Sequence, residues 1–229
     1  MKKLLHLASL ALVAASLASC GFLNYLGTAI ATNPEFQIHG DGSNDGIYNG
    51  QTYRVTKTAT CNYAWESADP TILILKTSGS DAYVTGKLPA DKTYTSKLTA
   101  RNADDATITP VSHEVVIYAW TLKVYDAAGN LVSNATQLAR NNTYVVKMVK
   151  VSGSTSNPTY TPVPKLIGGI KLSAGEENIS LGYSLSSSAY TKVSSTDLTL
   201  TIKTPNKAAS CTVSAKLGDV TQKLSIATK

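Results

Sequence analysis

The chain has 229 residues, a formal net charge of +6, twelve tyrosines, two phenylalanines and three cysteines. Its lysines stand singly along the sequence, without the clustered Lys/Arg or the module of a nucleic-acid-binding protein, so we expect no nucleic-acid partner. Abundant Ser, Thr, Val and Tyr favour strands, and no window after the first twenty residues has the periodicity of an amphipathic helix. The composition therefore predicts an all-β protein.

The first twenty residues have the organisation of a secretory signal. Lys2 and Lys3 form a basic start, residues 4–18 are an uncharged and mostly apolar run, and small residues then lead to Cys20. The apolar run is short for a membrane span and has no basic stop after it. One alternative stays open from these residues: an ordinary signal peptide that is cut nearby and leaves Cys20 as a plain thiol.

The ending Leu17-Ala18-Ser19-Cys20 resembles the lipobox of bacterial lipoproteins. The resemblance implies that residues 1–19 are a lipoprotein signal peptide, that Cys20 carries palmitate-like chains on sulfur, and that the new amino terminus is acylated. Two or more chains hold a protein firmly at a membrane, whereas a single chain holds it only marginally. In enterobacterial relatives an Asp after the cysteine favours the inner membrane, so Gly21 favours the outer membrane here.

Residues 20–34 are expected to form a lipidated tether between this anchor and the first domain. The segment is unusually apolar for a linker because it contains Phe22, Leu26 and Ile30. It could lie along the lipid surface, pack on the first domain or be disordered, and the sequence leaves these alternatives open.

A stretch rich in glycine and acidic residues follows the tether. Asp41, Ser43 and Asp45 have the spacing of the first half of a calcium loop, with His39 beside them. The twelfth position of such a loop is Thr52, where a bidentate Glu is needed. Because the same residue types are common in tight turns, the turn is the favoured interpretation and the metal site a weak candidate.

Alternation of apolar and polar side chains predicts one strand over residues 53–65, with Cys61 on its buried face. The carboxylates Asp81, Asp91 and Asp105 fall in predicted turns between later strands, where we expect them to be solvated.

Cys61 and Cys211 are the thiols that remain if Cys20 carries lipid. An exported compartment permits a disulfide, but the two residues lie in different halves of the chain, and their Cα atoms must come within about 7 Å. A Cys61–Cys211 bond and two separately buried thiols both stay open.

Residues 94–103 and the alternating stretch 111–117 resemble the last two strands of bacterial immunoglobulin-like domains, especially the polycystic-kidney-disease type. The resemblance implies that residues 35–118 form one immunoglobulin-like β-sandwich. Residues 139–147 echo residues 48–56 about ninety positions later, the period of tandem sandwich domains. Residues 119–229 are therefore expected to form a second sandwich.

Four features are expected inside the second domain. Residues 152–164 form a Ser/Pro-rich crossing, Gly168-Gly169 turns a hairpin, residues 175–178 form a turn, and Gly218-Asp219 turns the final hairpin.

We expect no enzyme and no cofactor. Only His39 and His113 offer imidazole after the signal, and the chain has no nucleophile elbow, zinc-binding helix motif or phosphate loop. The sequence therefore predicts a lipoprotein held at the bacterial cell envelope, with the outer membrane favoured. We expect it to act as a non-enzymatic binding and adhesion module for a protein or polysaccharide ligand.

Residues 41–46 and 152–164 are the candidate contact segments, because loops on such scaffolds carry most contacts. Two alternatives remain from other classes. One is a structural subunit that adds strands to a partner's sheet in an envelope or appendage assembly. The other is a carbohydrate-binding accessory module that uses exposed tyrosines.

Overall fold

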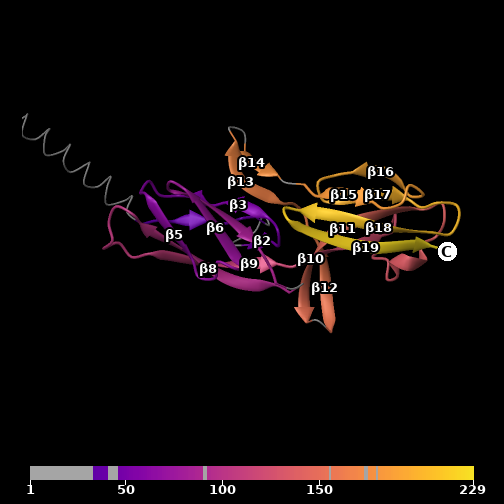
Figure 1. Cartoon of the computed structure of the whole chain (residues 1–229), viewed down its shortest axis with the longest axis horizontal. Helices are drawn as coiled ribbons and strands as arrows, with labels where there is room; N and C mark the ends of the chain where they lie inside the picture. Colours follow the sequence, from indigo (N-terminus) through magenta and orange to yellow (C-terminus); the bar gives the residue numbers. More distant parts are fainter. Residues whose placement is uncertain (1–32, 41–45, 90–91, 155, 173–174, 179) are drawn as a thin grey trace, which may run out of the picture.

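The computed structural model describes residues 33–40, 46–89, 92–154, 156–172, 175–178 and 180–229. Figure 1 shows two β-rich bodies placed end to end, with the strands up to β9 in one and the strands from β15 onward in the other. The only helical element in these ranges is a short 3₁₀ turn, η1 (Ala135–Gln137). The expectation of an all-β chain with tandem immunoglobulin-like sandwiches is confirmed.

The first domain is a sandwich of two sheets joined in the manner of immunoglobulin domains. One sheet has the order β2-β9-β8-β5 and the other the order β3-β7-β6, while β1 pairs with β4. The strands are β1 (Phe36–Gln37), β2 (Gly46–Tyr48), β3 (Thr52–Arg54), β4 (Thr56–Lys57), β5 (Tyr63–Ser67), β6 (Leu73–Ser78), β7 (Asp81–Gly86), β8 (Tyr94–Asn102) and β9 (Val111–Tyr118). The parallel pairing of β2 with β9 places the start of the domain beside its last strand.

The second domain repeats this plan with an insertion. Its sheets have the orders β10-β11-β17-β16, with β12 added beside β11, and β15-β18-β19, the two layers of a seven-strand sandwich. The strands are β10 (Trp120–Tyr125), β11 (Thr143–Ser154), β12 (Asn157–Pro162), β13 (Ile167–Leu172), β14 (Gly175–Asn178), β15 (Gly182–Leu185), β16 (Thr191–Ser195), β17 (Thr199–Lys203), β18 (Ala209–Leu217) and β19 (Val220–Thr228). Strands β12 to β14 form the insertion. They lie between β11 and β15, which correspond to β3 and β5 of the first domain.

The echo between residues 48–56 and 139–147 marks equivalent strands. Tyr53 in β3 and Tyr144 in β11 lie on corresponding strands, because β3 pairs with β7 as β11 pairs with β17, and both side chains are buried. The strongly alternating hairpins β8–β9 and β18–β19 also form as the sequence predicts, with Leu217 opposite Val220 at the final turn.

Several expectations about the strands are wrong. The stretch 53–65 is not one strand, because the chain breaks into β3, β4 and β5. The crossing at 152–164 is largely regular, since β11 continues to Ser154 and pairs with β12 as an arm that extends away from both sandwiches (Figure 1). Gly168-Gly169 does not turn a hairpin, because β13 runs through both glycines and pairs with β14, which occupies the expected turn at 175–178.

Each domain completes its core with one residue from the other. Ile167, in the insertion of the second domain, belongs to the hydrophobic cluster of the first and is only 2% exposed. Tyr48, in the first domain, belongs to the cluster of the second and is also 2% exposed. The two sandwiches are therefore joined by a buried apolar interface and not by a flexible linker. Burial of each of these side chains stabilises both domains together.

A hydrogen bond and a close backbone contact also hold the two domains together at this junction. Strand β9 ends at Tyr118 and β10 begins at Trp120, whose indole Nε1 donates a 2.8 Å hydrogen bond to the Asn49 carbonyl. Gly50 has φ +85°, and a Cβ at this residue would lie 2.2 Å from the Leu217 carbonyl oxygen. Only glycine allows this close approach between the first domain and the β18–β19 turn.

Candidate functional site

Several residues that the sequence marks as candidate sites lie outside the described ranges. These are Cys20 and the three positions of the candidate calcium loop, Asp41, Ser43 and Asp45. Within the described residues, no group of three or more His, Cys, Asp or Glu side chains is placed to hold a metal ion. No helix of the described part is long and apolar enough to cross a membrane.

The two histidines occupy different parts of the first domain. His39 is half-buried, and its backbone forms an isolated parallel β-bridge with Gly46. His113 faces Leu98 across the β8–β9 pair, and its ring lies 4.5 Å from the ring of Phe36, whereas the neighbouring Glu114 is exposed. The imidazole of His113 thus packs in an aromatic cluster at the side of the core.

The structure records Cys61 and Cys211 as free thiols in different domains. Cys61 lies in the turn before β5 instead of on a strand face, and it is only partly buried. Desolvation raises the pKa of its thiol. Cys211 is buried in the core of the second sandwich, and the Ser186 hydroxyl donates a hydrogen bond to its sulfur at 3.8 Å.

Asp81 is not a solvated turn residue as the sequence predicts. It opens β7 and forms two ion pairs, with Arg54 at 2.7 Å and with Lys57 at 2.8 Å. Hydrogen bonds from these cations lower the pKa of its carboxyl group. Asp105 is exposed, and hydrogen bonds from the hydroxyl and backbone of Thr107 lower its pKa, while Asp91 lies outside the described residues.

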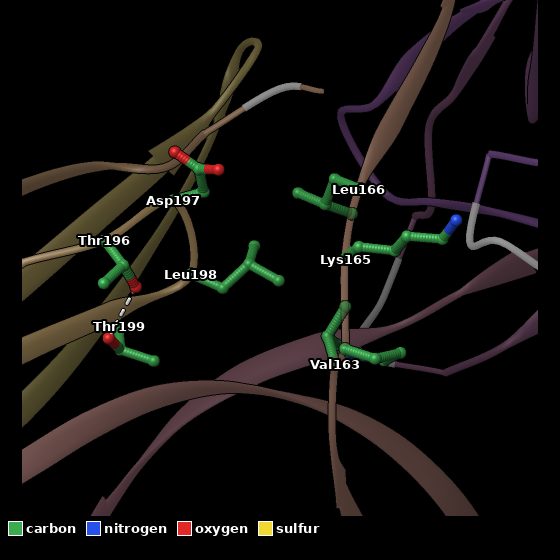
Figure 2. Close-up of a pocket in the computed structure, with 8 residues that line it drawn as sticks. Val163, Lys165, Leu166, Thr196, Asp197, Leu198 and Thr199 are labelled. Carbon is green, nitrogen blue, oxygen red and sulfur yellow. Dashed lines mark hydrogen bonds between the residues drawn. The ribbon is translucent and has the colours of Figure 1, made fainter. Parts of the chain in front are cut away.

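A depression of about 290 Å³ lies in the second domain, between the segment before β13 and the loop before β17. Figure 2 shows Leu166 and Leu198 pointing toward each other across it, with Lys165 extending away from Asp197. The hydroxyls of Thr196 and Thr199 hydrogen-bond to each other at 2.7 Å, which ties the loop to the start of β17. The volume suits a small group at most, and the walls mix apolar side chains with polar and charged ones.

A second surface is built by the outer face of sheet β10-β11-β12-β17. Lys123 on β10 stands directly opposite Lys147 on β11. The ammonium of Lys123 lies 3.9 Å from the ring centre of Tyr160, and that of Lys147 lies 4.6 Å from the ring centre of Tyr125. These contacts hold each cation over an aromatic ring. We call Lys123, Tyr125, Lys147 and Tyr160 the Lys/Tyr face.

Sequence inspection missed the Lys/Tyr face. Its lysines are 24 positions apart in the chain and become neighbours only through the register of β10 against β11. The available signal was the alternation in both strands, which puts Lys123 and Lys147 on the faces away from the core, but alternation does not give the pairing between strands.

A scan against protein-family models finds no match, and a search of curated proteins finds none either. Among solved structures, the chain is similar to domains 5–6 of the S-layer protein SbsC, with 16% identity, a TM-score of 0.26, and 86% of this chain and 98% of that chain covered. It is similar to the Escherichia coli adhesin FdeC, with 11% identity, a TM-score of 0.29, and 87% and 65% covered. It is also similar to the endo-fucoidan hydrolase MfFcnA9, with 14% identity, a TM-score of 0.32, and 90% and 35% covered. At these identities and TM-scores the matches carry no argument about function, and the description of this chain as tandem immunoglobulin-like sandwiches follows from its own strand order.

Proposed function

We propose that the chain is a bacterial lipoprotein, anchored through Cys20, that acts as a non-enzymatic binding and adhesion module at the cell envelope, on the outer membrane. The observation that carries the proposal is the shared junction between the two sandwiches. Ile167 and Tyr48 each cross into the other domain, so the pair behaves as one stiff unit. A stiff unit can hold a binding surface at a fixed distance from an anchor.

The order of the domains along the chain supports this role. The described chain enters the first sandwich at Asn33, and the carboxyl terminus lies at the far end of the second (Figure 1). An anchor on the amino-terminal side would therefore leave the second domain pointing away from the membrane, where it can meet a ligand.

Two features favour binding by side chains over a structural subunit that adds strands. The edge strand β16 is exposed along its length, but Lys192 and a break in register between Lys192 and Ser194 interrupt its edge. The arm strand β12 carries Pro158 and Pro162, which cannot donate backbone hydrogen bonds to an added strand. Charges, irregular register and prolines are the usual protections of an edge against pairing.

The anchor is tested on the native protein purified from membranes in detergent. Mass analysis of its amino-terminal peptide should show a cut before Cys20 and added acyl mass on that residue, and Cys20→Ala should release the protein into the soluble fraction. Cys61→Ala is the matched cysteine control and should stay with the membrane. A bare Cys20, or an intact leader on the native protein, would overturn the anchored role.

Display is tested separately by protease treatment of intact cells and of lysed cells. Cleavage in intact cells places the module on the outside of the envelope, as an adhesion role requires. Complete resistance in intact cells, with cleavage after lysis, contradicts adhesion.

A further inference from the structure

The net charge of the chain conceals a strong difference between its domains. Residues 35–118 contain seven Lys/Arg and ten Asp/Glu, whereas residues 119–229 contain twelve and five. The first domain is therefore net negative by three charges and the second net positive by seven. Such an asymmetry points to an anionic partner for the second domain.

The positive charge gathers on one sheet of the second domain. Strands β10, β11, β12, β16 and β17 together contain five lysines and no acidic residue: Lys123, Lys147, Lys150, Lys192 and Lys203. Among the described residues, the ion pairs are formed by Arg54, Lys57 and Arg101, all in the first domain. The lysines of this sheet are thus not neutralised by carboxylates within the described chain.

Three of these lysines share the outer face of the sheet. Side chains alternate along a strand, so Lys123 and Lys147 point away from the buried Leu122 and Met148. On β17, Lys203 follows the buried Ile202 in the same way. Lys150 belongs to the opposite face, where its ammonium lies 4.4 Å from the ring centre of Tyr118.

The spacing on this face fits an extended ligand. Lys123 and Lys147 are directly opposed, and like charges in that position destabilise a sheet unless an anion lies between them. Lys203 pairs with Thr143, four residues from Lys147 along β11, which is about 13 Å along the strand. One small anion cannot reach all three cations, whereas an extended chain with repeated anionic groups can.

We propose that this outer face, the Lys/Tyr face extended by Lys203, binds an acidic polysaccharide through its carboxylate or sulfate groups. The proposal rests on the proposed binding function and names its ligand class. The tyrosine rings hold the ammonium groups in place, so little side-chain entropy is lost on binding. Between Lys147 and Lys203, the hydroxyl of Thr201 supplies a hydrogen-bonding group for sugar hydroxyls.

The same face is poorly suited to nucleic acid. Arginine binds phosphate bidentately through its planar fork, whereas lysine binds phosphate as a point charge without that geometric specificity. Arg140 is the one arginine among residues 119–229, and its Nε already donates a hydrogen bond to the Lys229 carbonyl. The lysine ammonium is a point charge on a flexible stem, so it can pair with the repeated carboxylate or sulfate groups of a chain without a fixed geometry.

The test compares binding of the full-length protein in detergent to four probes at low and moderate salt: polygalacturonate, dextran sulfate, neutral dextran and double-stranded DNA. The face variant replaces Lys123, Lys147 and Lys203 by Gln. The control variant replaces Lys207, Lys216 and Lys223 by Gln, which removes the same charge from other surfaces of the second domain. Circular dichroism and thermal unfolding establish that both variants are folded.

We expect the unmodified protein to bind at least one acidic polysaccharide and not neutral dextran, with affinity falling as salt rises. The face variant should lose about tenfold or more in affinity, and the control variant less than about threefold. Preference for polygalacturonate or for dextran sulfate distinguishes carboxylate from sulfate recognition.

Three results would overturn the proposal: equal losses in both variants, no preference for acidic over neutral polysaccharide, or DNA binding that equals polysaccharide binding and depends on the same lysines. Self-association that only the face variant abolishes, seen by analytical ultracentrifugation, would instead identify the acidic domain of a second copy as the occupant. None of these outcomes touches the Cys20 anchor, whose mass analysis fails or succeeds independently.

Discussion

Replacing Ile167 by Ala should destabilise the first domain, although residue 167 belongs to the second domain in the chain. Leu166 and Ile167 are adjacent, but Leu166 belongs to the core cluster of the second sandwich and Ile167 to that of the first. Successive side chains of an extended segment point to opposite sides. The segment therefore places one apolar side chain in each core.

The cost of Ile167→Ala follows from its burial. The side chain is 2% exposed, so the substitution loses the transfer free energy of about three carbon groups at about 0.8 kcal/mol each, plus a cavity contribution. We expect a loss of about 2–4 kcal/mol in the free energy of unfolding of the first domain. Two kcal/mol corresponds to roughly a thirtyfold increase in the population of the opened state.

Hydrogen exchange followed by mass spectrometry can locate this loss. Ile167→Ala should accelerate exchange of the slowest amides in β8 and β9, the central hairpin of the first sandwich. Leu166→Ala is the matched control, and it should accelerate exchange mainly in β18 and β19. If Ile167→Ala accelerates β18 and β19 while β8 and β9 keep their protection, the residue does not complete the first core.

Three further substitutions test the structure elsewhere. Gly50→Ala should lower the melting temperature much more than Gly129→Ala, because both glycines have positive φ but only Gly50 would meet a carbonyl oxygen at 2.2 Å; equal shifts would contradict the close approach. Asp81→Asn should lower the free energy of unfolding by about 1–2 kcal/mol near pH 7. This difference should disappear as the pH falls through the lowered pKa of Asp81, because protonation also breaks the ion pairs of the unmodified protein. A difference in urea titrations that does not depend on pH would argue against these ion pairs. Ser96→Ala should leave stability unchanged or raise it, since the buried Oγ has no hydrogen-bond partner in the described part of the chain, and a loss above about 1 kcal/mol by thermal unfolding would reveal one.

Local patterns were sufficient for the elements whose partners are close in sequence. Hairpins β8–β9 and β18–β19 alternate strictly and are separated by clear turn residues, so their faces and pairing follow from the chain. The break between β4 and β5 carries neither Gly nor Pro, so the alternation across Cys61 predicts one continuous strand. The prolines of β12 indicated a loop, but Pro is compatible with an edge strand, where one N–H is not needed.

Long-range pairing accounts for the rest. Gln51 is fully buried and uses its side-chain amide to donate to the carbonyls of Gly40, at 2.6 Å, and Ile167, at 2.8 Å. Its Oε1 accepts a hydrogen bond from the backbone N–H of Tyr48. A polar residue at the start of a strand appears in the sequence as solvated, because the segment that covers it comes 116 positions later. The opposed lysines of the Lys/Tyr face escaped notice for the same reason.

The exchange of Tyr48 and Ile167 also implies an order of events during synthesis. The last strand of the first sandwich ends at Tyr118, so 49 further residues must emerge before Ile167 can enter that core. Domains usually fold one at a time from the amino terminus. Here the core of the first sandwich stays incomplete until residue 167 has been synthesised. The two domains therefore complete their folding together, unlike tandem domains that fold independently.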